Sequence, residues 1–124
     1  MSQIPDRKTG LSRIWAAFFY SLDGFRYALT HEAAFIQEAI IFVVAVIALV
    51  FLPFSLPWKA LLLFATAAVL IVELLNSAVE ALVDLASPGY HELAKRTKDL
   101  GSAAVLLSIV IAIFLWIMAI TTIV

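Results

Sequence analysis

The sequence predicts an all-α membrane protein in which an amphipathic surface helix precedes three transmembrane helices. Of the 124 residues, 65% are hydrophobic and only 14% are charged, whereas a soluble domain is usually about 45–50% apolar. The mean hydropathy is +1.09. The chain also contains three long apolar stretches, and about 20 such residues suffice to cross the hydrocarbon core of a bilayer. The length allows a single domain, residues 1–124.

The first element is expected at residues 11–30. Ile14, Phe18, Leu22 and Phe25 follow three- and four-residue spacing, and charged and aromatic residues lie between them, which is typical of a helix lying in the membrane interface. The alternative is that this segment simply begins a long first helix. The interruptions of the apolar pattern at Asp23-Gly24 and His31-Glu32 favour a separate surface helix. No cleaved signal peptide is expected, because charged residues precede any long apolar run.

The three spans are predicted at residues 35–54, 58–85 and 100–122. Prolines at positions 53 and 57 end the first span. The second begins near Trp58 and stops at Ser87-Pro88-Gly89. The third contains no charged residue from Leu100 to the last residue.

Basic residues predict the orientation of the spans. Four precede the first span and three lie between the second and third, namely Arg7, Lys8, Arg13, Arg26, Lys95, Arg96 and Lys98. Only Lys59 lies near the turn between the first and second spans. Because cytoplasmic loops carry an excess of Lys and Arg, the N-terminus and the expected 88–99 loop should face the cytoplasm.

A polar stripe inside the second span is the strongest functional signal. Its members are spaced so that all five fall on one helical face, within an arc of about 100°: Glu73, Asn76, Ser77, Glu80 and Asp84. A carboxylate at the membrane centre costs about 2.5–3.5 kcal/mol on insertion scales. The stripe therefore predicts a site for cations, protons or phosphates. Asp84, nearest the helix end, is expected to be structural and to pair across a helix contact.

Other polar residues are placed to converge on this stripe. Glu32 and Glu38 lie at the cytoplasmic start of the first span. Glu32 is the candidate for a second metal-binding carboxylate, in addition to those of the stripe. Lys98-Asp99 stands at the mouth of the third span, with Ser102 one helical turn beyond. Carboxylates for Mg²⁺ and a lysine for phosphate oxygens are what phosphoryl transfer requires. The positions of the four glycines fit neither of the two common phosphate-binding motifs, GxxxxGK[ST] and GxGxxG. The chain has no cysteine, which excludes thiol catalysis and cysteine-ligated metal sites. Proton translocation explains the acidic residues about as well as phosphoryl transfer does.

Two longer segments resemble the bacterial diacylglycerol kinase family: ELLNSAVEALVD at 73–84 and YHELAKRTKDLGS at 90–102. EAAFIQE at 32–38 and GLSR at 10–13 match as well, so the resemblance covers nearly the whole chain. It implies a homotrimeric enzyme of the bacterial inner membrane with active sites shared between subunits. That enzyme transfers the γ-phosphate of MgATP to the primary hydroxyl of diacylglycerol, giving phosphatidate.

The resemblance also implies roles for individual residues. Glu73 is the general base on the lipid hydroxyl. Glu32 and Glu80 hold Mg²⁺ that bridges the ATP phosphates, and Asn76, grouped with Glu73 as a catalytic residue, supports that cluster. Glu38 and Ser102 accompany Glu73 at the lipid substrate. The residues expected to bind ATP are Arg13, Tyr20, Glu32, Glu80, Gly89, Tyr90, His91, Lys98 and Asp99.

The chain departs from the family pattern at two positions. Ile36 stands where many members carry a basic residue, and Gly89 stands where an acidic residue is common, so Gly89 offers only backbone to a nucleotide. Two alternatives remain: an undecaprenol kinase of the same family, or a small proton- or cation-conducting membrane subunit.

Overall fold

The computed structural model describes residue 6 and residues 8–124, which form four α-helices and no strand. The helices are α1 (Gly10–His31), α2 (Ala33–Phe51), α3 (Leu56–Ala86) and α4 (Glu92–Thr121). Three of them, α2, α3 and α4, are long and apolar enough to cross a membrane. The all-α prediction with three candidate spans is therefore confirmed. Arg7, one of the basic residues in the orientation argument, lies outside the described residues.

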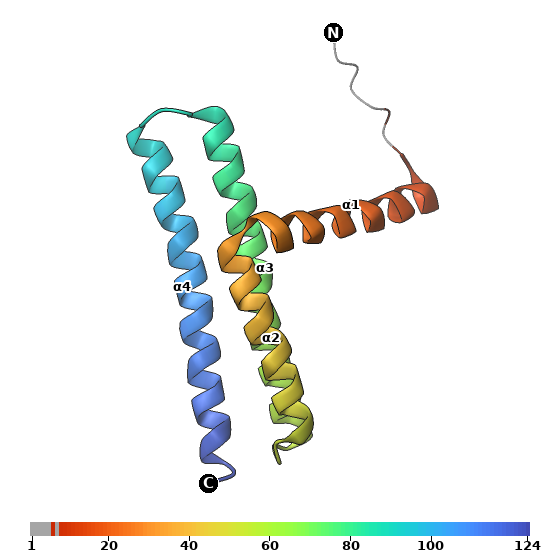
Figure 1. Cartoon of the computed structure of the whole chain (residues 1–124), viewed down its shortest axis with the longest axis vertical. Coiled ribbons are helices and arrows are strands. Elements are labelled where there is room, and N and C mark those ends of the chain that lie inside the picture. The colour runs from red at the N-terminus through yellow and green to blue at the C-terminus, as the bar shows by residue number, and fades with distance from the viewer. Residues whose placement is uncertain (1–5, 7) are drawn as a thin grey trace.

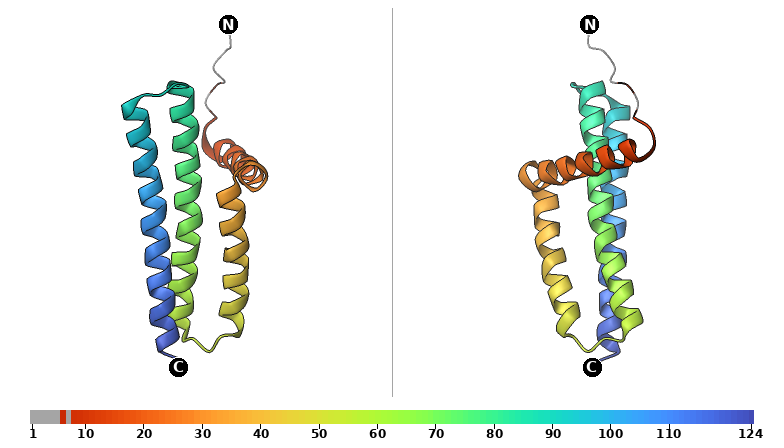
Figure 2. Two further views of the ribbon diagram at one scale, coloured as in Figure 1. Left: turned by 60° about the vertical axis from the view of Figure 1, so that its left-hand side comes forward. Right: turned by 90° about the vertical axis from the view of Figure 1, so that its right-hand side faces the viewer.

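The helix α1 is separate from the three long helices and runs across them. Figure 1 shows α2, α3 and α4 side by side along the long axis, with α1 crossing that direction, and Figure 2 shows the same arrangement from two other sides. The break falls at Glu32, whose backbone is extended (φ −105°, ψ 99°). Helix α1 passes through Asp23-Gly24 without interruption, so only the second of the two expected interruptions ends a helix.

The connection between α3 and α4 is shorter than expected. We expected a loop over residues 88–99, but α4 already begins at Glu92, so that expectation is wrong. Local interactions explain the longer helix. The His91 ring accepts a hydrogen bond from the Leu93 backbone N–H (3.1 Å) and caps the new helix. Ion pairs one turn apart, Glu92–Arg96 and Lys95–Asp99, then support its first turns.

Helix α3 contacts both α2 and α4, and small residues lie where α3 and α4 meet. Leu62 and Ala119 are fully buried in one cluster, and Ala65 and Ala112 belong to a second. Such small side chains let transmembrane helices approach closely. Much apolar surface on the other faces stays exposed, as at Phe51 and Ile111. That surface requires lipid or another protein to cover it.

Candidate active site

The polar stripe of α3 is buried at its deep end and exposed at the other. Glu73 and Asn76 are the buried polar residues of the described chain, at 7% and 8% exposure. Ser77 and Glu80 are partly buried, and Asp84 is exposed. The stripe thus leads from the packed part of the helices to the end of α3. This gradient fits a site that is reached from one side of the membrane.

Glu73 lies at a meeting point of carboxyl groups from different elements. Its carboxyl group lies close to that of Glu38 on α2. The charges of Glu80 and Glu32 also act on it. One oxygen of Glu38 is buried with no hydrogen-bond partner in the described part of the chain. Carboxyl groups are among the side chains that serve in general acid–base catalysis, so this cluster is a candidate for proton transfer.

Asn76 joins the stripe to α4. Its amide nitrogen donates a long hydrogen bond to Glu80 Oε1 (3.4 Å). Its amide oxygen is buried, and no described residue donates to it. A Cβ at Gly101 on α4 would overlap this oxygen. Gly101 therefore makes room for Asn76. The sequence analysis assigned no role to Gly101, although a glycine inside a helix costs about 1 kcal/mol relative to alanine and so indicates a packing requirement.

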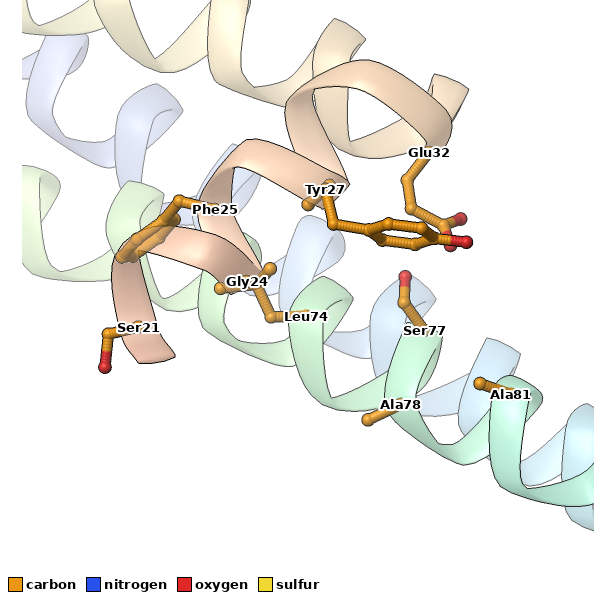
Figure 3. Close-up of a pocket in the computed structure, with 10 residues that line it drawn as sticks. Ser21, Gly24, Phe25, Tyr27, Glu32, Leu74, Ser77, Ala78 and Ala81 are labelled. Carbon is orange, nitrogen blue, oxygen red and sulfur yellow. The ribbon is translucent and has the colours of Figure 1, made fainter. Parts of the chain in front are cut away.

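Glu32 lines a cavity of about 450 Å³ between α1 and α3. In Figure 3 the Tyr27 ring lies between the Glu32 carboxylate and the Ser77 hydroxyl, which points toward that ring. The remaining lining is mostly small or apolar, including Ala78 and Ala81. The break between α1 and α2 thus directs the Glu32 carboxylate toward the same helix that carries the acid stripe.

A second cavity, of about 270 Å³, lies between the end of α3, the connecting loop and the start of α4. It brings together most of the loop residues expected to bind nucleotide, Gly89, Tyr90, His91, Lys98 and Asp99. The Ser87 hydroxyl donates to the Gly89 carbonyl (3.0 Å) and fixes the turn. Lys98 Nζ pairs with Asp84 Oδ1 at 2.6 Å, which joins α4 to α3. This is the pairing across a helix contact that was expected of Asp84.

Within one chain, other expected site residues lie elsewhere. Arg13 and Tyr20 line a separate hollow beside the start of α1, and neither lines the cavity that contains Lys98. Ser102 is exposed on α4, directly after Gly101. The fold therefore groups the expected residues other than Ser102 into three places: the carboxyl cluster at Glu73, the α3–α4 cavity, and the α1 hollow.

Comparison with known proteins places the chain among lipid kinases. The family model for prokaryotic diacylglycerol kinase matches residues 19–120. The chain belongs to the prokaryotic diacylglycerol kinase family. It is 44% identical over 113 residues to a diacylglycerol kinase of Escherichia coli (strain K12), an alignment covering 91% of this chain and 93% of that protein. It is 43% identical over 117 residues to a diacylglycerol kinase of Pseudomonas aeruginosa, covering 94% and 95%.

A more distant relative also aligns over most of the chain. A diacylglycerol kinase of Helicobacter pylori (strain J99) is 34% identical over 115 residues, covering 92% of this chain and 89% of that protein. The resemblance predicted from the motifs at 73–84 and 90–102 is therefore confirmed. As a diacylglycerol kinase, the chain is an ATP-dependent lipid kinase, and this favours the kinase interpretation over the ion-conducting alternative.

The residues of this kinase fit a magnesium ion only if phosphate oxygens of the nucleotide supply part of its coordination. No three His, Asp or Glu side chains form a metal-binding group in the described part of the chain. Glu80 nevertheless lies beside Asn76, whose amide oxygen is buried without a donor in the described part of the chain, and Glu32 shares a cavity with Ser77 of α3. Mg²⁺ usually takes one or two carboxylates together with substrate phosphates. The donor set is thus suited to magnesium that arrives with ATP.

Proposed function

We propose that this kinase transfers the γ-phosphate of MgATP to the primary hydroxyl of diacylglycerol, producing phosphatidate, at the carboxyl cluster around Glu73. The observation that carries the proposal is a buried carboxyl group on α3 with carboxylates from α2 and from the α1–α2 break around it. A lipid hydroxyl at the membrane interface needs a base at this depth, because its acyl chains remain in the hydrocarbon region.

Glu73 is the general base of the reaction. It removes the proton of the lipid hydroxyl while that oxygen forms a bond to the γ-phosphorus, and the bond from the γ-phosphorus to the β-phosphate oxygen breaks to release ADP. Glu38, which lies close to Glu73, and Ser102 orient the lipid headgroup. Asn76 supports the arrangement through its bond to Glu80.

Glu32 and Glu80 would hold Mg²⁺, and the bound ion supplies positive charge that offsets the charge of the transferring phosphoryl group. The two residues approach from different elements, Glu32 from the break after α1 and Glu80 from α3. A γ-phosphate held by such an ion would have to come within reach of Glu73 for the transfer to occur.

The nucleotide binds in the α3–α4 cavity, with Lys98 and Asp99 on α4 and the Gly89–Tyr90–His91 segment around it. Gly89 contributes backbone only. Arg13 and Tyr20 complete the site from the α1 helix of a neighbouring subunit, because they line a different hollow from Lys98 in their own chain. This division is consistent with a homo-oligomer that shares its active sites between subunits; the number three comes from the family resemblance. The subunit contacts would also cover part of the exposed apolar surface of the spans.

The protein lies in the bacterial inner membrane with its N-terminus in the cytoplasm. Figures 1 and 2 support this orientation, because the loop end of α3 and α4 extends beyond the level of α1. That end carries Lys95, Arg96 and Lys98. With α1 in the interface, the α3–α4 cavity is placed where cytoplasmic ATP is available.

The test is phosphate transfer from γ-labelled ATP by the purified full chain in mixed micelles with Mg²⁺, with either diacylglycerol or undecaprenol as acceptor. Labelled phosphatidate formed well above the undecaprenol product supports the proposal. Preference for undecaprenol would retain the site and change the lipid. Absence of product from both would contradict the assignment of the carboxyl cluster as a transfer site.

A further inference from the structure

The ion pair between Lys98 and Asp84 differs from the other ion pairs of the described residues. Lys95–Asp99 and Arg96–Glu92 each join residues one turn apart on α4. Lys98–Asp84 instead joins two helices, at 2.6 Å. The Lys98 side chain is 43% exposed, against 61% for Lys95 and 64% for Arg96. Lys98 is thus the most enclosed of the three paired cations, and α3 holds it.

The position of this pair matters because both partners line the α3–α4 cavity. Asp84 is one helical turn beyond Glu80 on α3, and the charge of Glu80 also reaches Lys98. A lysine ammonium has three donor hydrogens. One is directed to Asp84 Oδ1, which leaves two for oxygens of another group in the cavity. A phosphate chain is the class of anion whose oxygens can accept from a lysine ammonium, and a bound metal ion offsets its charge near a carboxylate such as Glu80.

Structural support of the α3–α4 contact is a weak explanation for Asp84. Both side chains are substantially solvated, with Asp84 65% exposed, and exposed ion pairs add little to stability. The two helices are already joined deeper in the membrane, where Leu62 and Ala119 are fully buried. What Asp84 does change is the freedom of Lys98, because a lysine side chain otherwise samples many rotamers and loses that freedom when it binds a ligand.

We propose that Asp84 is a positioning residue for nucleotide binding, whose carboxylate holds the Lys98 ammonium at the rim of the α3–α4 cavity in place to receive phosphate oxygens of ATP. The inference rests on the proposed nucleotide site. It adds that Asp84 acts through Lys98 and contacts neither the metal ion nor the lipid. The opposite arrangement, in which Asp84 competes with the nucleotide for Lys98, predicts tighter nucleotide binding when Asp84 loses its charge.

The experiment measures MgATP binding to the full-length, detergent-solubilised protein by titration calorimetry, without lipid acceptor. For Asp84→Asn we expect the dissociation constant of MgATP to rise by about 3- to 10-fold, as for coupled residues of one salt-bridge network. Asp84→Glu recovers most of the affinity, because it restores the carboxylate. In a Lys98→Met background, Asp84→Asn produces no further loss. Glu92→Gln, which removes the carboxylate of the exposed pair on α4, is the matched control and leaves binding unchanged.

The same variants are then assayed for transfer to diacylglycerol. Asp84→Asn should raise KM for MgATP by the same factor while kcat and the Mg²⁺ titration at saturating nucleotide stay within about twofold of the parent, as expected when a ground-state contact is lost. Unchanged or tighter binding by Asp84→Asn, an equal loss in the Lys98→Met background, or a shifted Mg²⁺ requirement would each overturn the proposal. Because binding is measured without lipid, failure of diacylglycerol as acceptor affects the proposed function and leaves this result intact.

Discussion

Replacing Gly101 with alanine tests whether close packing of α4 against Asn76 shapes the active site. A Cβ at this position would overlap the Asn76 amide oxygen and lie 3.2 Å from its Cγ. Alanine in a helix gains about 1 kcal/mol over glycine, whereas overpacking costs about 1–3 kcal/mol. The net expectation is a loss of roughly 0–2 kcal/mol in the free energy of unfolding. Because Asn76 must also move from Glu80, we expect turnover to fall by about 10- to 100-fold.

Two companion variants isolate the cause. Gly24→Ala, at a helical glycine with no described atom within 4 Å of the new Cβ, reports the propensity gain alone and should raise thermal stability in detergent. In an Asn76→Ala background the overlap is gone, so Gly101→Ala should no longer destabilise the protein. Initial rates with diacylglycerol and MgATP complete the assay. Unchanged turnover in Gly101→Ala, with the same stability gain as Gly24→Ala, would refute the packing argument.

Three further substitutions have distinct expected outcomes. Glu80→Gln should raise the Mg²⁺ concentration for half-maximal rate by roughly tenfold, because one charged ligand is lost; an unchanged Mg²⁺ titration would argue against ligation there. Thr66→Val removes the acceptor of the Trp116 indole hydrogen bond (3.0 Å) and should lower the free energy of unfolding by about 0.5–2 kcal/mol. Thermal unfolding in detergent measures this loss, and identical melting curves would contradict it. Leu62→Ala, at a fully buried position, should lower the free energy of unfolding by about 2–5 kcal/mol and leave the rate per folded protein unchanged. Melting at the parent temperature would contradict the burial of Leu62.

The sequence was sufficient for the helices and the stripe, since both depend on local patterns. Apolar runs longer than a bilayer requires predict the spans, and the spacing of Glu73, Asn76 and Glu80 predicts their common face. The helical start of α4 at residues 92–99 was not predicted, because a charged run resembles a loop unless the cap at His91 and the pairs that follow it are recognised.

Contacts between distant elements were harder to predict. That Asp84 would pair across a helix contact was expected, but its partner Lys98 depends on the rotation of α3 against α4, which no periodicity specifies. The role of Gly101 depends on the same packing. For Arg13 and Tyr20 the difficulty is different: one chain separates them from the α3–α4 cavity, so their part in a site remains a proposal about the assembly.

The most direct test of the central claim is the Glu73→Gln substitution, assayed for phosphate transfer from γ-labelled ATP to diacylglycerol. The variant keeps the size of the side chain and removes its capacity to accept a proton. Glu92→Gln, an exposed carboxylate on α4, serves as the matched control and should transfer phosphate at the parent rate. Loss of transfer by Glu73→Gln, with the assembly intact and MgATP affinity little changed, is the predicted result. Transfer at the parent rate would contradict the assignment of Glu73 as the base.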